Sequence, residues 1–181
     1  YIITDLNGDG EISDDDRTYV GDAQPDLTFG WQNNFTWKNW DFSFFFRGTI
    51  GNKVLNNPRA AYANNTYLIG TNALDDELTY TMKESSRVCS YYLENGSFIR
   101  LDNLALGYTF DTKKINWLDK ARLYFAAQNL FVITGYKGLD PEVELFRGES
   151  SDTDAGLSPG IEPRQFFPKA RTFTLGVNLT F

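Results

Sequence analysis

The end of the chain alternates strictly between apolar residues and polar or small residues. The apolar positions within residues 171–181 are Phe173, Leu175, Val177, Leu179 and Phe181. Successive side chains of a β-strand point to opposite faces, so this segment predicts a strand with one apolar and one polar face. Its length suits a tilted strand that crosses the hydrocarbon core of a membrane, which takes about 9–11 residues. A half-buried strand of a soluble sandwich gives the same alternation, so the other segments must decide.

Four earlier segments show the same alternation. Residues 27–37 and 40–47 alternate, and Lys38-Asn39 between them is a tight-turn signal. Residues 98–110 alternate with a change of parity at Asp102-Asn103, which predicts a β-bulge. Residues 121–131 alternate again, ahead of the terminal strand at 170–181. The sequence therefore predicts an all-β chain of five antiparallel strands.

The connections between these strands alternate between short and long. Residues 38–39 and 111–120 are short, whereas residues 48–97 and 135–168 are long, and 48–97 shows no clear strand pattern. Outer-membrane barrels have short periplasmic turns and long extracellular loops. The chain therefore looks like consecutive strands of a large antiparallel transmembrane β-barrel. Counting back from a periplasmic C-terminus places residues 1–26, 48–97 and 135–168 outside the cell.

Composition narrows the range of functions. The chain has 181 residues, a net charge of -7, 16% aromatic residues and no histidine. The acidic balance argues against a nucleic-acid partner, and the lack of histidine excludes a His-based triad or zinc site. Aromatic girdles mark the interfaces of membrane barrels, and Trp37 and Trp40 flank the 38–39 turn as such a girdle would. The single Cys89 excludes a disulfide within the chain.

An acidic, glycine-rich loop near the start follows the spacing of an EF-hand-type calcium loop. Its candidate ligands are Asp5, Asn7, Asp9, the backbone carbonyl of Glu11 and Asp16. Ca²⁺ takes six to eight oxygen ligands, and Gly10 stands at the position of the sharp turn. The loop predicts a structural Ca²⁺ clip. An acidic surface turn that binds nothing is the alternative, and the sequence leaves both open.

Motifs along the whole chain resemble the C-terminal barrel region of the SusC/RagA-type TonB-linked outer-membrane proteins of Bacteroidetes. The matching segments include, in order, Asp5-Leu6-Asn7-Gly8-Asp9-Gly10, Pro25-Asp26-Leu27-Thr28-Phe29-Gly30, Trp40-Asp41-Phe42-Ser43, Phe46-Arg47-Gly48, Asn95-Gly96-Ser97-Phe98-Ile99-Arg100-Leu101-Asp102-Asn103, Leu106-Gly107-Tyr108, Ala127-Gln128-Asn129-Leu130-Phe131, Tyr136-Lys137-Gly138-Leu139-Asp140-Pro141-Glu142 and Leu179-Thr180-Phe181. Residues 60–90 and 143–167 follow no fixed pattern of this family.

The resemblance implies a part of a larger importer. We interpret the chain as a fragment that lacks an N-terminal plug and the segment that contacts the TonB complex. The resemblance further implies an outer-membrane location with the strands against lipid. A SusD-like surface lipoprotein would be the partner, and oligosaccharides or peptides would be the substrate. Phe181 resembles the terminal signal that the barrel-assembly machinery recognises in its clients.

Strand parity places five polar or aromatic residues toward the barrel lumen: Arg47, Arg100, Asp102, Arg122 and Tyr124. Such residues would line the cavity or hold the plug by hydrogen bonds and ion pairs. Four loop tyrosines could stack on sugar rings or simply pack within their loops: Tyr62, Tyr67, Tyr91 and Tyr92.

Two other functions are compatible with parts of the pattern. A soluble, extracellular, calcium-dependent carbohydrate-binding β-sandwich would bury the Phe- and Trp-rich faces against a second sheet. A glycoside hydrolase would need a spaced carboxylate pair, whereas Asp75, Asp76 and Glu77 are adjacent in a polar loop and are typical of solvated charge. We therefore expect a transport protein and not an enzyme.

Overall fold

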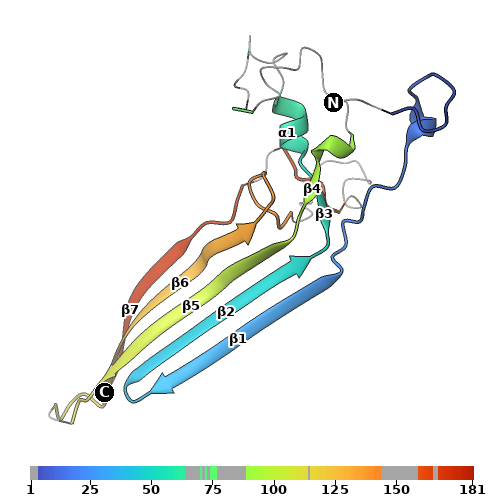
Figure 1. Ribbon diagram of the computed structural model, residues 1–181. Helices are drawn as coiled ribbons and strands as arrows, with labels where there is room; N and C mark the ends of the chain where they lie inside the picture. The colour runs from blue at the N-terminus through green and yellow to red at the C-terminus, as the bar shows by residue number, and fades with distance from the viewer. Residues whose placement is uncertain are drawn as a thin grey trace, which may run out of the picture. The chain divides into compact units, whose positions relative to one another are not determined.

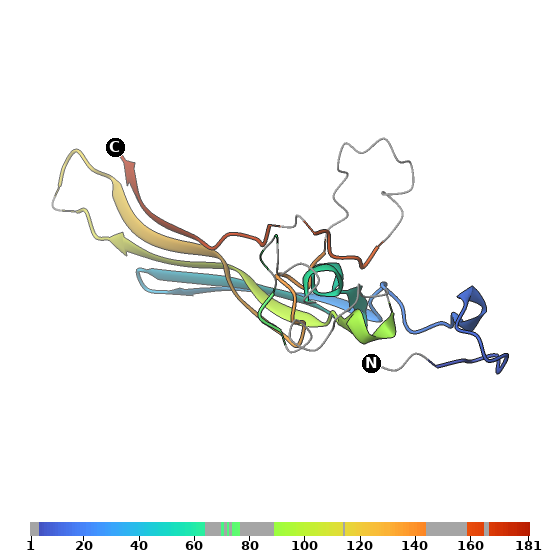
Figure 2. The same ribbon diagram turned by 90° about the horizontal axis from the view of Figure 1, so that it is seen from above.

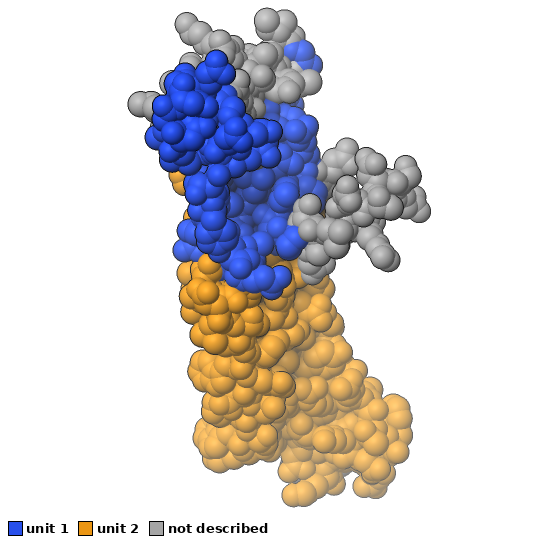
Figure 3. Space-filling view, turned by 90° about the vertical axis from the view of Figure 1, so that its right-hand side faces the viewer, with its two compact units in different colours: residues 1–24, 52–95, 143–165 blue, residues 25–51, 96–142, 166–181 orange. Residues whose placement is uncertain are grey.

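The computed structural model describes residues 4–63, 70, 72, 74–76, 89–113, 115–143, 159–164 and 167–181. The chain forms two compact units (Figure 3). Unit 1 comprises residues 1–24, 52–95 and 143–165, and unit 2 comprises residues 25–51, 96–142 and 166–181. Within the described ranges, no helix has the length and apolar character needed to cross a membrane.

Unit 2 is one antiparallel sheet of five strands (Figure 1). The strands are β1 (Leu27–Trp37), β2 (Trp40–Ile50), β5 (Phe98–Phe110), β6 (Lys120–Thr134) and β7 (Thr172–Thr180). Their order is β1-β2-β5-β6-β7, so each strand pairs with its neighbours in the chain order of this unit. Figure 2 shows the strands twisting along their length, as right-handed strand twist requires. All five strands predicted from the alternation are present, and β2 and β6 run about three residues further than the pattern indicated.

The register keeps apolar residues on one face across the whole sheet. One cross-strand row illustrates this: Phe35 pairs with Phe42, Phe42 with Leu106, Leu106 with Phe125, and Phe125 with Leu175. The adjacent row on the opposite face contains Thr36, Asp41, Gly107, Tyr124 and Gly176. We call these the apolar face and the polar face. Phe35 is 52% exposed and Leu175 is 73% exposed, and no second sheet covers the apolar face among the described residues of unit 2. The sandwich alternative needs such a sheet.

Two irregularities interrupt the ladders of this sheet at one height. Asp102 is the extra residue between Leu101 and Asn103, which confirms the bulge predicted there. Opposite it, Asn129 and Leu130 stand between the paired residues Gln128 and Phe131, and Asn129 has a φ of 51°. The second irregularity was not predicted. Two extra residues preserve the parity of the apolar positions on either side, so the alternation pattern does not register them.

Unit 1 contains short elements where the sequence showed no strand pattern. Strand β3 (Lys53–Leu55) pairs with β4 (Leu93–Asn95), and helix α1 (Asn57–Tyr62) follows β3. The side chain of Asn56 caps this helix by accepting from the backbone N–H of Arg59. Two 3-10 helices, Asp14–Asp16 and Ser90–Tyr92, complete the described elements. The expectation that 48–97 lacks strands was wrong, because three-residue strands are too short to show a periodicity.

The core of unit 1 is small and includes one of the loop tyrosines. Ala60, Ala63 and Tyr92 are buried together, with Leu55 and Cys89 packed against them. Tyr92 is completely buried, so it packs within its own unit and offers no surface for a sugar ring. Tyr67 lies outside the described residues, as does Glu77 of the acidic triplet.

Candidate functional site

The polar face of the sheet carries the five residues that parity placed toward a lumen. The structure brings Arg47, Arg100 and Asp102 together near the bulge. Arg122 and Tyr124 lie on β6 toward the other end of the sheet, where the turn at Lys38 joins β1 to β2. The five therefore form two separate groups.

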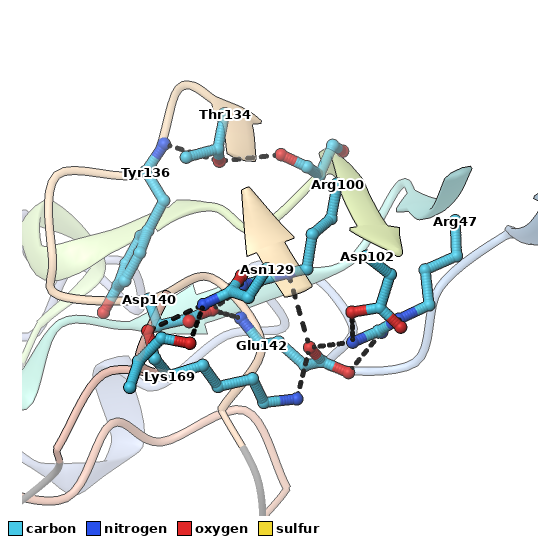
Figure 4. Close-up of polar contacts among 11 residues, drawn as sticks. Arg47, Arg100, Asp102, Asn129, Thr134, Tyr136, Asp140, Glu142 and Lys169 are labelled. Carbon is cyan, nitrogen blue, oxygen red and sulfur yellow. Dashed lines mark hydrogen bonds and ion pairs between the residues drawn. The ribbon is translucent and has the colours of Figure 1, made fainter. Parts of the chain in front are cut away.

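The first group is a charged cluster built from six residues: Arg47, Arg100, Asp102, Asp140, Glu142 and Lys169. Arg47 donates from Nε to Oδ2 of Asp102 over 3.0 Å. Its two terminal nitrogens donate to the two carboxylate oxygens of Glu142 over 2.5 and 2.8 Å. This forked pairing is the geometry that guanidinium and carboxylate groups prefer. Lys169 donates to Oε2 of the same Glu142 over 2.7 Å (Figure 4).

Arg100 is the buried centre of this cluster, with only 1% of its side chain exposed. One terminal nitrogen donates to Oδ1 of Asp140 over 2.5 Å, and the other donates to Oδ1 of Asn129. Nε of Arg100 has no hydrogen-bond partner among the described residues and lies 3.7 Å from Oε2 of Glu142. The amide of Asn129 in turn donates to the carbonyl oxygen of Lys169 over 2.7 Å.

The cluster keeps Glu142 ionised. Burial opposes the charged form of this carboxylate, but the hydrogen bonds from Arg47 and Lys169 outweigh it, so the pKa of Glu142 is lowered. Three cationic and three anionic side chains make up the cluster, so their formal charges cancel. Such a balanced set is suited to holding segments together and offers no surplus charge to an ionic ligand.

Sequence reasoning identified only half of this cluster. It missed Asp140, Glu142 and Lys169, and it also missed Asn129, which accepts a hydrogen bond from Arg100. Parity says nothing about residues outside strands, and Asp140, Glu142 and Lys169 all lie in connections. Asp140, Glu142 and Asn129 did belong to matching family segments, and this membership was the signal in the sequence that pointed to them.

The second group spans three strands near the turn end of the sheet. Arg122 on β6 donates from Nε to Oδ1 of Asp41 on β2 over 2.9 Å. β5 lies between these two strands, and its Gly107, which pairs with Asp41, lies beneath the contact between the two side chains. Tyr124 lies over Gly176 of β7 in the same way, and the guanidinium of Arg122 is 5.2 Å from the Tyr124 ring centroid. A side chain at either glycine would displace the group above it.

A hollow of about 260 Å³ lies on unit 2 and is lined only by uncharged residues. Its polar lining groups come from Gln32, Ser43, Asn103 and Gln128, with the ring of Phe45 among them. Phe45 is the aromatic residue that departs from the polar pattern of its strand face. Amide and hydroxyl groups can donate hydrogen bonds to uncharged polar groups and accept hydrogen bonds from them.

The acidic loop near the start is ordered by its own hydrogen bonds. Both carboxylate oxygens of Asp5 accept backbone N–H groups, from Gly8 over 2.6 Å and from Gly10 over 2.8 Å. Asp16 accepts from Ser13 and Leu6, and these bonds lower its pKa. Oxygen donors of this kind suit Ca²⁺, but the described residues contain no group of three or more acidic, histidine or cysteine side chains placed to share a metal ion. Calcium binding by Asp5, Asn7, Asp9, Glu11 and Asp16 stays a prediction.

The last residue contacts the 111–119 connection. The ring of Phe181 stacks on Trp117 with the centroids 5.8 Å apart and the planes 13° apart. Phe181 remains 73% exposed. Its role as an assembly signal also stays a prediction.

Comparison with known proteins relates almost the whole chain to one class of receptor. The chain is 36% identical, over 99% of its length, to TonB-dependent receptor P3 of Formosa agariphila. It is 30% identical, again over 99% of its length, to TonB-dependent receptor SusC of Bacteroides thetaiotaomicron. The chain spans 19% of the first of these relatives and 17% of the second. The chain matches no protein-family model.

Solved structures give the same result for the fold. The structure of the RagAB peptide transporter matches 94% of this chain with a TM-score of 0.71 and 25% sequence identity, and the match covers 19% of that chain. The RagAB peptide importer in its 'closed-closed' state matches 98% of this chain with a TM-score of 0.69 and 24% identity. The five-stranded sheet of unit 2 thus has the fold of a section of a TonB-dependent transporter barrel. The chain is a homologue, over nearly its whole length, of the SusC/RagA-type TonB-dependent receptors.

Proposed function

We propose that this chain is a section of the wall, with its attached loops, of a TonB-dependent importer in a bacterial outer membrane. The apolar face lies against lipid and the polar face lines the lumen. The observation that carries this proposal is the apolar row from Phe35 to Leu175, which crosses all five strands without a charged residue and is largely exposed. Membrane barrels turn an apolar band of this kind outward to the lipid, where exposed apolar side chains are favourable.

The free edges of the sheet support the same proposal. β1 and β7 are edge strands of 11 and 9 residues, and neither contains a charged residue or a proline. Soluble proteins protect edge strands with charges, prolines or bulges, because an open edge pairs with other chains. A closed barrel removes both edges by pairing them with further strands. We infer that β1 and β7 are paired in the working protein.

The orientation follows from the two ends of the sheet. The tight turn at Lys38 and the 111–119 connection lie at the end that also holds Phe181, and this end faces the periplasm in our proposal. Trp37, Trp40 and Trp117 are exposed at this end, where interfacial aromatic residues belong. The long connections 48–97 and 135–168 then lie outside the cell in our proposal.

The substrate in this proposal is an oligosaccharide or a peptide, taken up with a SusD-like surface lipoprotein and powered through TonB. A similar solved structure is described as a peptide transporter, which supports the peptide class. The relatives are named as receptors, and the similar solved structure is named as a transporter, which supports a role in transport. The uncharged hollow around Phe45 is compatible with either class, since both present neutral polar groups.

Cell fractionation of the full-length protein tests this proposal. We expect recovery in the detergent-soluble outer membrane together with a lipoprotein, and protease cleavage within residues 48–97 on intact cells. A deletion strain should then lose uptake of one oligosaccharide or peptide from a panel. Recovery in the soluble periplasm or medium would overturn the proposal.

A further inference from the structure

We propose that the charged cluster is a latch that fixes both stems of the β6–β7 connection to the wall of the sheet. Asp140 and Glu142 belong to the stem that leaves β6, and Lys169 belongs to the stem that enters β7. Arg47 of β2 and Arg100 of β5 hold these stems from the polar face. The inference rests on the proposed function only for the statement that this face is lumenal.

Glu142 joins the wall of the sheet to both stems of the β6–β7 connection. Its carboxylate receives the forked pair from Arg47 and the ammonium of Lys169, which is 27 residues away in the sequence. The wall is thereby tied to one stem, and that stem is tied to the other. Figure 4 shows the carboxylate of Glu142 lying between the side chains of Arg47 and Lys169.

Arg100 connects the sheet to both stems by a second set of hydrogen bonds, which is independent of the pair between Arg47 and Glu142. It holds Asp140, whose Oδ1 also accepts the backbone N–H of Glu142 over 2.9 Å. It also holds Asn129, which donates to the backbone carbonyl of Lys169. The first stem is therefore fixed to the sheet through the side chains of Glu142 and Asp140. The second stem is fixed through the side chain and the backbone carbonyl of Lys169.

The burial of the cluster argues for a positioning role. The side chains of Arg100 and Asp140 are only 1% and 5% exposed. Buried ion pairs add little net stability compared with apolar packing, but removing one partner leaves an uncompensated charge and is strongly unfavourable. Such a cluster therefore enforces one arrangement of the segments that contribute to it. The bulges at Asp102 and Asn129 aim two of the contributing side chains at this point.

The matched control is a second paired arginine of the same face. Arg122 forms an ion pair with Asp41 on the same sheet but touches neither stem of the β6–β7 connection in the described residues. Arg100→Gln and Arg122→Gln thus each remove one paired cation from the polar face. Only the first removes a part of the latch.

Hydrogen–deuterium exchange on the purified full-length protein in detergent tests the latch. We expect Arg100→Gln to speed exchange of the backbone amides within 136–143 about tenfold or more, while Arg122→Gln leaves that segment unchanged. Lys169→Met is the milder variant, in case Arg100→Gln does not fold, and should speed exchange at 167–171.

Two results would overturn the latch. One is unchanged exchange at 136–143 in Arg100→Gln and at 167–171 in Lys169→Met. The other is an equal increase in Arg122→Gln, which would show general loosening of the sheet. The exchange measurement does not depend on transport activity, so it can refute the latch alone. The proposed function is refuted separately, by cell fractionation.

Discussion

Arg122 on β6 reaches across the intervening strand β5 to pair with Asp41 on β2, 81 residues earlier in the chain. The contact is possible because the residue of β5 beneath it is Gly107. A Cβ at position 107 would lie closer than 3.0 Å to both the guanidinium of Arg122 and the carboxylate of Asp41. The ion pair between Arg122 and Asp41 therefore depends on the absence of a side chain at Gly107.

Replacing Gly107 tests whether the ion pair needs this space. Gly107→Ala should force Arg122 and Asp41 apart and lower the free energy of unfolding by about 1–3 kcal/mol, the usual effect of an overpacked site. Urea unfolding of the full-length protein in detergent measures the change. Gly135→Ala is the control, because nothing lies within 4 Å of its Cβ position. Equal stability of the two variants would show that the space above Gly107 is not needed.

Glu142 makes the charged cluster sensitive to acid. Its pKa in the folded protein is lowered from 4.5, so its ionised form stabilises the fold above that pH. This stabilisation is lost as the pH falls through the lowered pKa. Between about pH 6 and about pH 3, the wild type should therefore lose more thermal stability than Glu142→Gln. Parallel curves for the two proteins would mean that Glu142 is not held ionised by Arg47 and Lys169.

Calcium binding by the acidic loop can be decided by calorimetry. We expect EDTA-treated full-length protein to bind Ca²⁺, and Asp5→Asn combined with Asp9→Asn to lose one site. The loop must first turn its side-chain oxygens toward a common point, since the described geometry has no such group. Asp14→Asn is the control, because Asp14 pairs with Arg17 and stands outside the ligand positions. Identical titrations of the double variant and the wild type would favour the simple acidic turn.

The terminal aromatic residue can be tested as an assembly signal. Phe181→Ala should lower the amount of full-length protein in the outer membrane and raise the amount that is degraded in the periplasm. Phe110→Ala removes an exposed aromatic residue from a different strand and should assemble normally. Trp117→Ala removes the ring that stacks on Phe181 and separates loss of that contact from loss of the signal. Equal assembly of Phe181→Ala and Phe110→Ala would argue against a special role for the terminus.

The five strands of unit 2 were predictable from the sequence, whereas only three of the six residues of the charged cluster were, because alternation is a local signal and the contacts of the cluster are not. Alternation is local, and a strand with one apolar face shows it over its whole length, as residues 171–181 do. The contact between Arg47 and Glu142 joins residues 95 apart and depends on how connections return to the sheet. Parity placed Arg47 on the correct face but had no means of naming its partners. The short strands β3 and β4 escaped notice because three residues show no period.

A barrel wall requires that the apolar face of the sheet, and not the polar face, meets lipid. In a full-length protein in which Cys89 and every other native cysteine are replaced by serine, a fluorescent label at Leu175→Cys reports the apolar face. A label at Thr174→Cys reports the polar face of the same strand. We expect nitroxide-labelled lipid to quench the fluorescence of the label at position 175 and to leave the label at position 174 bright. Absence of quenching at both positions, or equal quenching at both, would contradict a barrel wall.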